Sequence, residues 1–188
     1  VLQFASLSFD VAIEEILPTL FAGAELVLRN EAIVESMAAF FESVDEFSLT
    51  VLNLPTAFWT ALVEHMASTG AKLPSSVRLV VVGGEAISRT VLDRFLAMAP
   101  GIRCLNGYGP TEVTITSTLF DTAKLAEMNP GDDVPIGQPL PHVNAFICAT
   151  DGSLVPRGAH GELVLAGPSV SKGYLNRPDL TAARFINA

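Results

Sequence analysis

The sequence predicts an α/β protein with a doubly wound, mostly parallel sheet flanked by helices, followed by the start of a small β-barrel-like subdomain. Strand-like and helix-like segments alternate up to about Phe120 and are joined by short connections, as in parallel sheets. The run RLVVV (78–82) is almost wholly apolar, which is typical of a strand buried on both faces. After Phe120, short strands separated by turns replace this alternation. We therefore expect one subdomain over residues 1–125 and a second over 126–188.

Capping and breaking residues set the expected bounds of the first subdomain's elements. Asp10 is a plausible N-cap and Gly23 a stop for the first helix, which Pro18 is expected to kink or divide. Pro55 suits the first turn of a later helix. The predicted helices cover residues 11–22, 34–47, 55–68 and 88–99, and the predicted strands cover residues 25–28, 49–53, 78–82 and 102–105.

The second subdomain is predicted to begin with a long connection. Residues 121–142 are rich in Pro, Gly and Asp, and short strands follow at 143–149, 154–155 and 161–167. A short helix is expected at 179–185. The chain starts at Val1 without an initiator Met and stops directly after this helix, so we expect a segment of a longer polypeptide.

Composition argues against several classes of protein. The net charge is −9 and the 11 Lys and Arg residues are scattered, so the sequence has no basic stripe for nucleic acid. No apolar run approaches the ~20 residues that a membrane-spanning helix needs. Cys104 and Cys148 each lie in an apolar run without metal-ligand spacing, and we expect buried free thiols. Such thiols suit a reducing cytoplasm.

Irregular loops are predicted to meet at the carboxyl ends of the parallel strands, where open sheets bind their ligands. These loops are NLP (53–55), GGE (83–85) and NGYGPTE (106–112). The last combines an amide, an aromatic ring, a hydroxyl and a carboxylate. Such groups could contact a base edge, stack on a base, contact phosphate and bind Mg²⁺. A plain turn is the structural alternative, because Gly-Pro is common turn punctuation.

The motif NGYGPTE resembles the Asn-x-Tyr-Gly-Pro-Thr-Glu motif of adenylation domains in nonribosomal peptide synthetases. Further matches are Phe9-Asp10 before a helix and GAELVL, the segment VVVGGEAIS, and the segment GELVLAGPSVSKGYLNRPDLTAARF. They occur in the family's order over nearly the whole chain. The resemblance implies activation of an amino acid by ATP to an aminoacyl adenylate and pyrophosphate. The acyl group then passes to the phosphopantetheine thiol of a peptidyl carrier domain, in an assembly line that also has condensation domains.

The resemblance also implies roles for particular residues. Asn106 and Tyr108 would contact the adenine, Tyr108 by stacking, while Thr111 would contact phosphate and Glu112 would bind Mg²⁺; Thr111 and Glu112 are the expected catalytic residues. The expected nucleotide contacts are completed by Gly84, Glu85 and Gly107. The family's phosphate loop, Thr-Gly-Asp segment and C-terminal lysine have no counterpart in this sequence, so we expect the isolated chain to be inactive without the rest of the adenylation domain. Lys172 stands where the family usually has Arg.

Asp10 occupies the position at which the family pairs a carboxylate with the substrate's α-ammonium group, although it could instead simply cap the helix. Glu14 lies four residues later, on the same helix face. Because an unpaired buried carboxylate is costly, a basic amino acid such as ornithine or lysine is one expected partner, and a protein cation is the other. Glu15 is a candidate for the surface. The motif matches predict a pocket lined by Asp10, Val11, Glu14, Leu52, Val81, Gly83, Gly107, Ile115 and Thr116.

Two other functions stay open on the sequence. A carboxylic acid–CoA ligase shares the family's chemistry, but Asp10 argues against it because acids without an α-ammonium group need no such carboxylate. A non-catalytic binding or structural module is the alternative from a different class.

Overall fold

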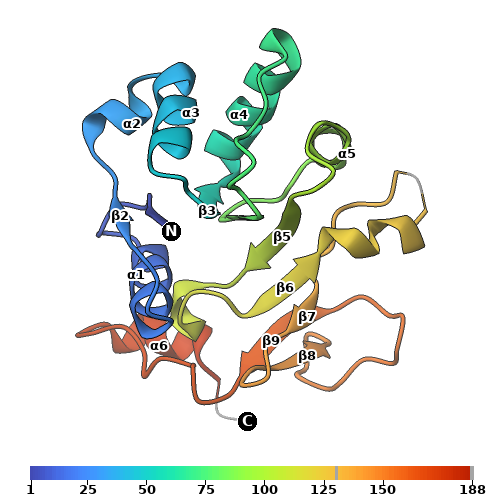
Figure 1. Ribbon diagram of the computed structural model, residues 1–188. Coiled ribbons are helices and arrows are strands. Elements are labelled where there is room, and N and C mark those ends of the chain that lie inside the picture. The colour runs from blue at the N-terminus through green and yellow to red at the C-terminus, as the bar shows by residue number, and fades with distance from the viewer. Residues whose placement is uncertain (130, 187–188) are drawn as a thin grey trace. The chain divides into compact units, whose positions relative to one another are not determined.

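The computed structural model describes residues 1–129 and 131–186, which form two compact units. Unit 1 comprises Val1–Tyr108 and Thr118–Gln138. Unit 2 comprises Gly109–Ser117 and the chain from Pro139 onward. Figure 1 labels the helices and strands of both.

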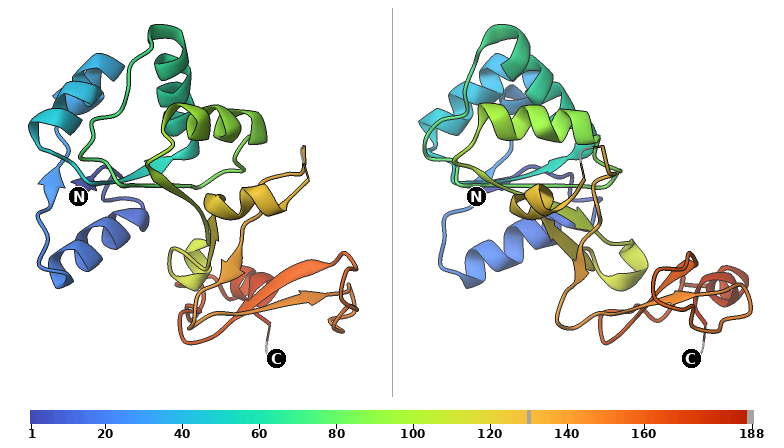
Figure 2. Two further views of the ribbon diagram at one scale, coloured as in Figure 1. Left: turned by 45° about the vertical axis from the view of Figure 1, so that its right-hand side comes forward. Right: turned by 90° about the vertical axis from the view of Figure 1, so that its right-hand side faces the viewer.

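The centre of unit 1 is a sheet with the strand order β3-β4-β5-β6-β7. Strands β3 (Val51–Pro55), β4 (Leu79–Gly83) and β5 (Arg103–Tyr108) pair in parallel, while β6 (Thr118–Asp121) pairs with β5 in the antiparallel sense. The short strand β7 (Gln138–Pro139) lies at the edge. A mostly parallel central sheet flanked by helices confirms the predicted fold class (Figures 1 and 2).

Helices cover both faces of this sheet. Figure 2 shows α3 (Met37–Glu46), α4 (Thr56–Thr69) and α5 (Arg89–Met98) on one side and α1 (Val11–Phe21) on the other. Strands β1 (Leu2–Gln3) and β2 (Val27–Leu28) form a small parallel pair beside α1. A 3₁₀ helix, η2 (Thr122–Glu127), follows β6 within the segment predicted as a connection.

The structure narrows one prediction about helices and shows that another was wrong. Helix α1 continues through Pro18 to Phe21, so the proline does not divide it. The single helix predicted over residues 34–47 is two helices, α2 (Glu31–Glu35) and α3. They separate at Ser36, whose extended backbone lets its hydroxyl accept a hydrogen bond from the backbone N–H of Ala39 at 3.1 Å. Ser36 is thus an N-cap that begins a new helix.

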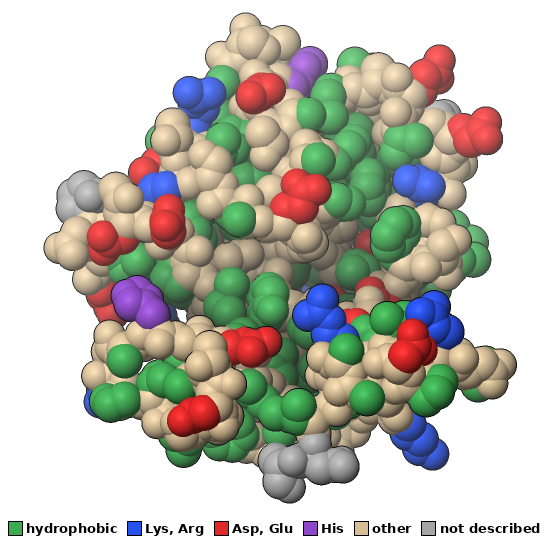
Figure 3. All heavy atoms as spheres, turned by 180° about the vertical axis from the view of Figure 1, so that it is seen from behind, with side chains coloured by type: hydrophobic (Ala, Val, Ile, Leu, Met, Phe, Trp, Pro, Cys, Tyr) green, Lys and Arg blue, Asp and Glu red, His purple; other side chains and the backbone are tan. Residues whose placement is uncertain are grey.

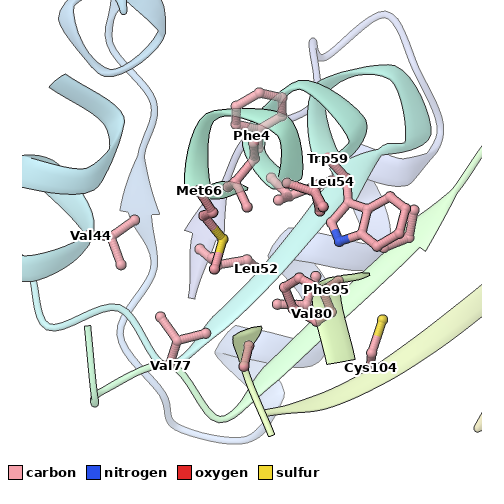
Figure 4. Close-up of a cluster of buried hydrophobic side chains, with 14 of the residues drawn as sticks. Phe4, Val44, Leu52, Leu54, Trp59, Met66, Val77, Val80, Phe95 and Cys104 are labelled. Carbon is pink, nitrogen blue, oxygen red and sulfur yellow. The ribbon is translucent and has the colours of Figure 1, made fainter. Parts of the chain in front are cut away.

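The hydrophobic core lies between the sheet and the helices α3, α4 and α5 (Figure 4). Trp59 is fully buried and meets the ring of Phe95 edge-on at 5.6 Å between ring centroids. Leu52, Val80 and Cys104 come from neighbouring strands at the same register level and are all buried. Alternate residues of β3 and β4 are buried and half-buried, so one face of these strands faces the core.

Both cysteines are buried free thiols, as predicted. Burial raises the pKa of the Cys104 thiol to about 12, although a hydrogen-bonding contact with Thr122 opposes the shift. The thiol therefore stays protonated at neutral pH and behaves as a small apolar side chain.

Unit 2 is built on an antiparallel pair of strands, β8 (Asn144–Cys148) and β9 (Glu162–Ala166). Leu154 forms a bridge with Cys148, at the place where a short strand was predicted. The unit also contains the 3₁₀ helix η1 (Thr111–Val113) and the helix α6 (Pro178–Arg184). The antiparallel strands agree with the elements predicted for this part of the chain.

Charged side chains of both signs are mixed on the surface. On the face drawn in Figure 3, Lys and Arg lie among Asp, Glu and hydrophobic side chains. Arg89 pairs with Asp93 at 2.9 Å, and Arg103 pairs with Asp121 at 2.8 Å. Among the helices that the structure describes, none has the length and apolar character needed to cross a membrane.

Candidate functional site

The carboxyl ends of the three parallel strands lie level with one another. Pro55, Gly83 and Gly107 are register partners across β3, β4 and β5. A Cβ atom on Gly83 would lie 2.7 Å from the carbonyl oxygen of Gly107, which is closer than Cβ atoms approach backbone oxygens. Glycine at position 83 therefore allows this close approach of β4 to β5.

Replacing Gly83 by alanine is expected to force β4 and β5 apart and to lower the free energy of unfolding by about 1–3 kcal/mol. Gly107→Ala is the matched control, because a Cβ there would meet its nearest atoms, in the side chains of Leu119 and Val81, at an ordinary 3.7 Å. Urea denaturation of the complete protein measures both changes. Equal losses for the two variants would contradict this explanation.

Strand register determines which residues share the face opposite the core. Asn53, Val81 and Leu105 are register partners, two residues before the level of Gly83. Val81 and Gly83 were predicted to line the pocket, and the structure places them on one face of β4. Leu52 was predicted to join them, but it is fully buried in the core and is in register with Val80. Asn53, not Leu52, is in register with Val81, because a shift of one residue moves a strand side chain to the other face.

Helix α1 presents the predicted acidic residues. Asp10 directly precedes the helix, and Asp10, Val11 and Glu14 are all half-buried. In the part of the chain that the structure describes, the Asp10 side chain caps no backbone N–H of α1. The carboxylate therefore has no part in starting the helix, contrary to the simpler of its two expected roles.

Glu15 was expected at the surface, and that expectation was wrong. Its side chain is 2% exposed. Its Oε2 accepts hydrogen bonds from the backbone N–H groups of Phe4 at 3.0 Å and Ala5 at 3.0 Å, and from the side-chain amide of Gln3 at 3.2 Å. Burial raises the pKa of Glu15, while these hydrogen bonds favour the ionised form. Glu15 thus fixes the segment after β1 to the helix that carries Asp10 and Glu14.

The first part of the NGYGPTE motif is strand, not loop. Strand β5 continues to Tyr108, so Asn106, Gly107 and Tyr108 have fixed orientations. Asn106 is buried and donates a side-chain hydrogen bond to the carbonyl of Pro135 at 2.8 Å. Tyr108, at the strand end, is 38% exposed, which leaves ring surface for stacking.

The turn after β4 is held from the neighbouring helix. Gly84 has a φ of 92°, and Gly84 and Glu85 are both exposed. The Thr56 hydroxyl, in the first turn of α4, lies 3.0 Å from the carbonyl oxygen of Gly83 and 3.1 Å from that of Glu85. Thr56 therefore fixes the path of a segment predicted to contact nucleotide.

The remaining predicted residues belong to unit 2. Thr111 is exposed at the start of η1, and Glu112 follows it half-buried. The Tyr174 hydroxyl donates a hydrogen bond to Glu112 Oε1, and the backbone N–H of Ser171 donates to the Glu112 carbonyl at 2.8 Å. The hydrogen bond from Tyr174 holds the pKa of the Glu112 carboxyl below its ordinary value. Glu112 is therefore ionised at neutral pH, and its carboxylate is hydrogen-bonded to the Tyr174 hydroxyl.

Backbone strain marks the end of this turn. Thr114 and Ile115 have positive φ values of 58° and 71°, which β-branched residues rarely adopt. A Cβ on Gly109 would lie 1.8 Å from the carbonyl oxygen of Ile115, so the chain folds back on itself here. Ile115 and Thr116, both predicted pocket residues, are half-buried just after η1. Strained backbone of this kind is frequent at functional sites.

Asn53, Glu15, Thr56 and Tyr174 are the residues that sequence reasoning missed. Strand alternation, read one residue later, would have found Asn53. The other three act through contacts between segments distant in sequence, such as Tyr174 and Glu112, which are 62 residues apart. Periodicity carries no signal for such contacts.

Known proteins resemble this chain over nearly its full length. The family model described as "AMP-binding enzyme" matches residues 1–175. Isonitrile lipopeptide synthase from Streptomyces coeruleorubidus is 39% identical over 98% of the chain, and Tyrocidine synthase 1 from Brevibacillus parabrevis is 32% identical over 98%. The chain spans 12% and 16% of the lengths of these two relatives.

Solved structures give the same result. The N-terminal subdomain of Klebsiella oxytoca NpsA, in complex with 3-hydroxybenzoyl-AMSN, matches with a TM-score of 0.84 at 28% identity, over 100% of this chain and 46% of that one. The nonribosomal peptide synthetase FmoA3 in its AMPPNP-bound form matches with a TM-score of 0.86 over 98% of this chain and 20% of that one. The chain belongs to the family of AMP-binding enzymes, and its relatives are nonribosomal peptide synthetases and their adenylation domains.

Proposed function

We propose that the chain supplies the amino-acid pocket and part of the ATP site of an adenylation domain, which activates an amino acid in a nonribosomal peptide synthetase. The observation that carries the proposal is the half-buried Asp10, whose carboxylate takes no part in capping the helix it precedes. It is available for a substrate's α-ammonium group. A carboxylate oxygen of the amino acid attacks the α-phosphorus of ATP, and the bond to pyrophosphate breaks.

Several of the proposed nucleotide contacts have support in the geometry of their own unit. In unit 1, the exposed ring of Tyr108 at the end of β5 suits stacking on adenine. Gly84 and Glu85 lie in the exposed turn after β4. The proposed adenine contact of Asn106 rests on the motif alone, because its side chain is buried and donates to the Pro135 carbonyl. In unit 2, the exposed Thr111 hydroxyl suits a phosphate oxygen. We propose that units 1 and 2 belong to separate subdomains of the complete lobe, so that Gly109–Ser117 belongs with the second subdomain and the first extends to Gln138, beyond the boundary expected near residue 125.

Glu112 fits a role as the protein ligand of Mg²⁺. It is ionised and has an oxygen donor, the ligand type that Mg²⁺ prefers. Among the described residues, no three His, Cys, Asp or Glu side chains gather as a metal cluster. This agrees with an ion held by one carboxylate, phosphate oxygens and water. Bound there, Mg²⁺ would neutralise phosphate charge as pyrophosphate leaves.

The proposed pocket favours a basic amino acid. Asp10 would bind the α-ammonium group, and Glu14, one helical turn later, adds a second negative charge. Val11, Val81, Gly83 and Gly107 are the further lining residues proposed in unit 1. Asn53, in register with Val81, replaces Leu52 in this set and offers a polar group to the substrate.

Replacing Glu14 by glutamine is expected to reduce the use of ornithine and lysine by about 10-fold or more, because the substrate's ammonium group loses a charged partner. Amino-acid-dependent exchange of pyrophosphate into ATP by the complete protein, with a panel of amino acids and 3-hydroxybenzoate, measures this. Glu31→Gln, an exposed change in α2, is the control. Unchanged specificity after Glu14→Gln would rule out the basic substrate.

The same panel tests the general function. Exchange with any amino acid supports amino-acid activation, and the 188-residue chain alone is expected to give none. Exchange with 3-hydroxybenzoate alone would favour activation of an aryl acid, since the NpsA structure contains a 3-hydroxybenzoyl analogue. An acyl-CoA product would instead favour a carboxylic acid–CoA ligase. No exchange with any acid in a folded complete protein would favour a non-catalytic module.

The proposed partners follow from this function. The matching structure of an artificially fused adenylation–PCP di-domain, NpsA-ThdA, shows that a relative can be joined to a carrier domain. We therefore propose that the activated acyl group passes to a carrier domain's phosphopantetheine thiol, beside condensation domains of the same assembly line. The buried free cysteines suit a reducing cytoplasm.

A further inference from the structure

The segment Ser169–Tyr174 of unit 2 is fastened to the turn that carries Glu112. The backbone N–H of Ser171 donates to the Glu112 carbonyl at 2.8 Å. The Thr114 hydroxyl donates to the Ser169 carbonyl at 2.6 Å. The Tyr174 hydroxyl donates to Glu112 Oε1. The first contact holds the backbone of the turn, the second holds the Thr114 side chain, and the third holds the Glu112 carboxylate itself.

Tyr174 is itself held in place from the helix α6. Its backbone N–H donates to the Thr181 hydroxyl at 2.9 Å, and that hydroxyl donates to the Arg177 carbonyl at 2.9 Å. The Tyr174 ring meets the Phe185 ring edge-on, with centroids 5.6 Å apart. A Cβ on Gly173 would lie 2.5 Å from the Thr181 side chain, so the chain also packs closely against α6 here. These contacts hold the Tyr174 ring in place, so its hydroxyl has a defined position beside the Glu112 carboxylate.

A glutamate side chain has several rotatable bonds, and a half-exposed one samples many rotamers. A hydrogen bond to one carboxylate oxygen removes much of this freedom and leaves the other oxygen for a ligand. Hydrogen bonds to a metal-binding group orient it in this way in metalloproteins.

We propose that Tyr174 is a positioning residue, which holds the Glu112 carboxylate in the orientation that binds the divalent cation of the ATP complex. This inference rests on the proposed role of Glu112 as the metal ligand. Tyr174 touches neither the cation nor the reacting atoms and acts only through Glu112. Its hydroxyl is needed for this role, whereas its ring serves packing against Phe185.

The test is Mn²⁺ binding by the complete protein in the presence of α,β-methylene-ATP, followed by the electron paramagnetic resonance signal of free Mn²⁺. Tyr174→Phe keeps the ring and is expected to weaken Mn²⁺ binding about 10-fold, the effect of losing a hydrogen bond that orients a metal ligand. Thr114→Ala is the matched control, because it removes the other side-chain hydrogen bond between the same two segments. It is expected to change Mn²⁺ binding less than about 2-fold. Thermal unfolding checks that both variants are folded.

A double-mutant cycle with Glu112→Gln separates positioning from a merely structural effect. In that background, Tyr174→Phe is expected to cause no further loss of Mn²⁺ binding. An equal loss in both backgrounds would overturn the inference, as would a loss in Tyr174→Phe no larger than that in Thr114→Ala. If Glu112→Gln leaves Mn²⁺ binding unchanged, the proposed metal role of Glu112 fails and the inference fails with it. Pyrophosphate exchange by the wild-type protein tests the adenylation function separately.

Discussion

Replacing Glu15 by alanine is expected to lower the free energy of unfolding by about 3–5 kcal/mol. The change removes the acceptor for the backbone N–H groups of Phe4 and Ala5 and for the side-chain amide of Gln3. These donors lie at or near the core, where water replaces a lost partner poorly. Because the same hydrogen bonds fasten α1 to the segment after β1, Asp10 and Glu14 should also be less precisely oriented in the variant.

Urea denaturation of the complete adenylation domain measures the loss of stability. Glu64→Ala, at an exposed position of α4, is the matched control and is expected to change stability by about 0.5 kcal/mol or less. Losses of similar size in the two variants would contradict a stabilising role for the hydrogen bonds of Glu15.

Glu15 should also make stability depend on pH. Burial raises its pKa in the folded protein, so the native state keeps this proton to a higher pH than the unfolded chain does. The stability that the protonated group contributes is complete below the unfolded pKa, and it is lost as pH rises through the raised folded pKa. As pH rises through that window, the free energy of unfolding of Glu15→Gln should therefore fall less than that of the wild type. Parallel plots of unfolding free energy against pH for the two proteins would contradict a raised pKa at Glu15.

Replacing Glu112 by glutamine is expected to slow pyrophosphate exchange by about 100-fold or more. The change keeps the size of the side chain but removes the charge that would bind Mg²⁺ against the phosphates. Raising the Mg²⁺ concentration should restore part of the rate, since weaker binding is the cause.

A second acidic position in unit 2 provides the control for this change. Glu162 lies exposed in β9, and Glu162→Gln is expected to leave the exchange rate within about 2-fold of the wild type. Exchange kinetics at a series of Mg²⁺ concentrations measure both variants. A Glu112→Gln rate equal to that of the control would contradict a metal role for Glu112.

The sequence predicted the parallel strands well because each is a short apolar run with a clear stop. The strand expected at residues 78–82 is observed as β4 over Leu79–Gly83, and the one expected at 102–105 begins β5 at Arg103. Strand β5 continues through Gly107 to Tyr108, however, because pairing with β6 overrides the local turn preference of glycine. Tertiary hydrogen bonding thus decided where this element ended.

The pocket was harder to predict because its details depend on register and on distant contacts. One residue separates Leu52 in the core from Asn53 on the opposite face, and a motif match without an observed register cannot distinguish them. Glu14 and Glu15 are adjacent acidic residues, and only the segment folded against α1 shows that Glu15 is the buried one. Local sequence pattern identified the helices and strands, while packing between them determined which side chains are buried and which face the proposed pocket.

The proposed chemistry is tested most directly by following oxygen from the amino acid. The complete protein, with its carrier domain, is given ATP and an amino acid that it activates, labelled with ¹⁸O in the carboxylate. If the carboxylate attacks the α-phosphorus, the AMP released on transfer to the carrier thiol carries one ¹⁸O atom, which mass spectrometry detects. Unlabelled AMP, or ¹⁸O in inorganic phosphate with ADP as the other product, would contradict activation through an aminoacyl adenylate.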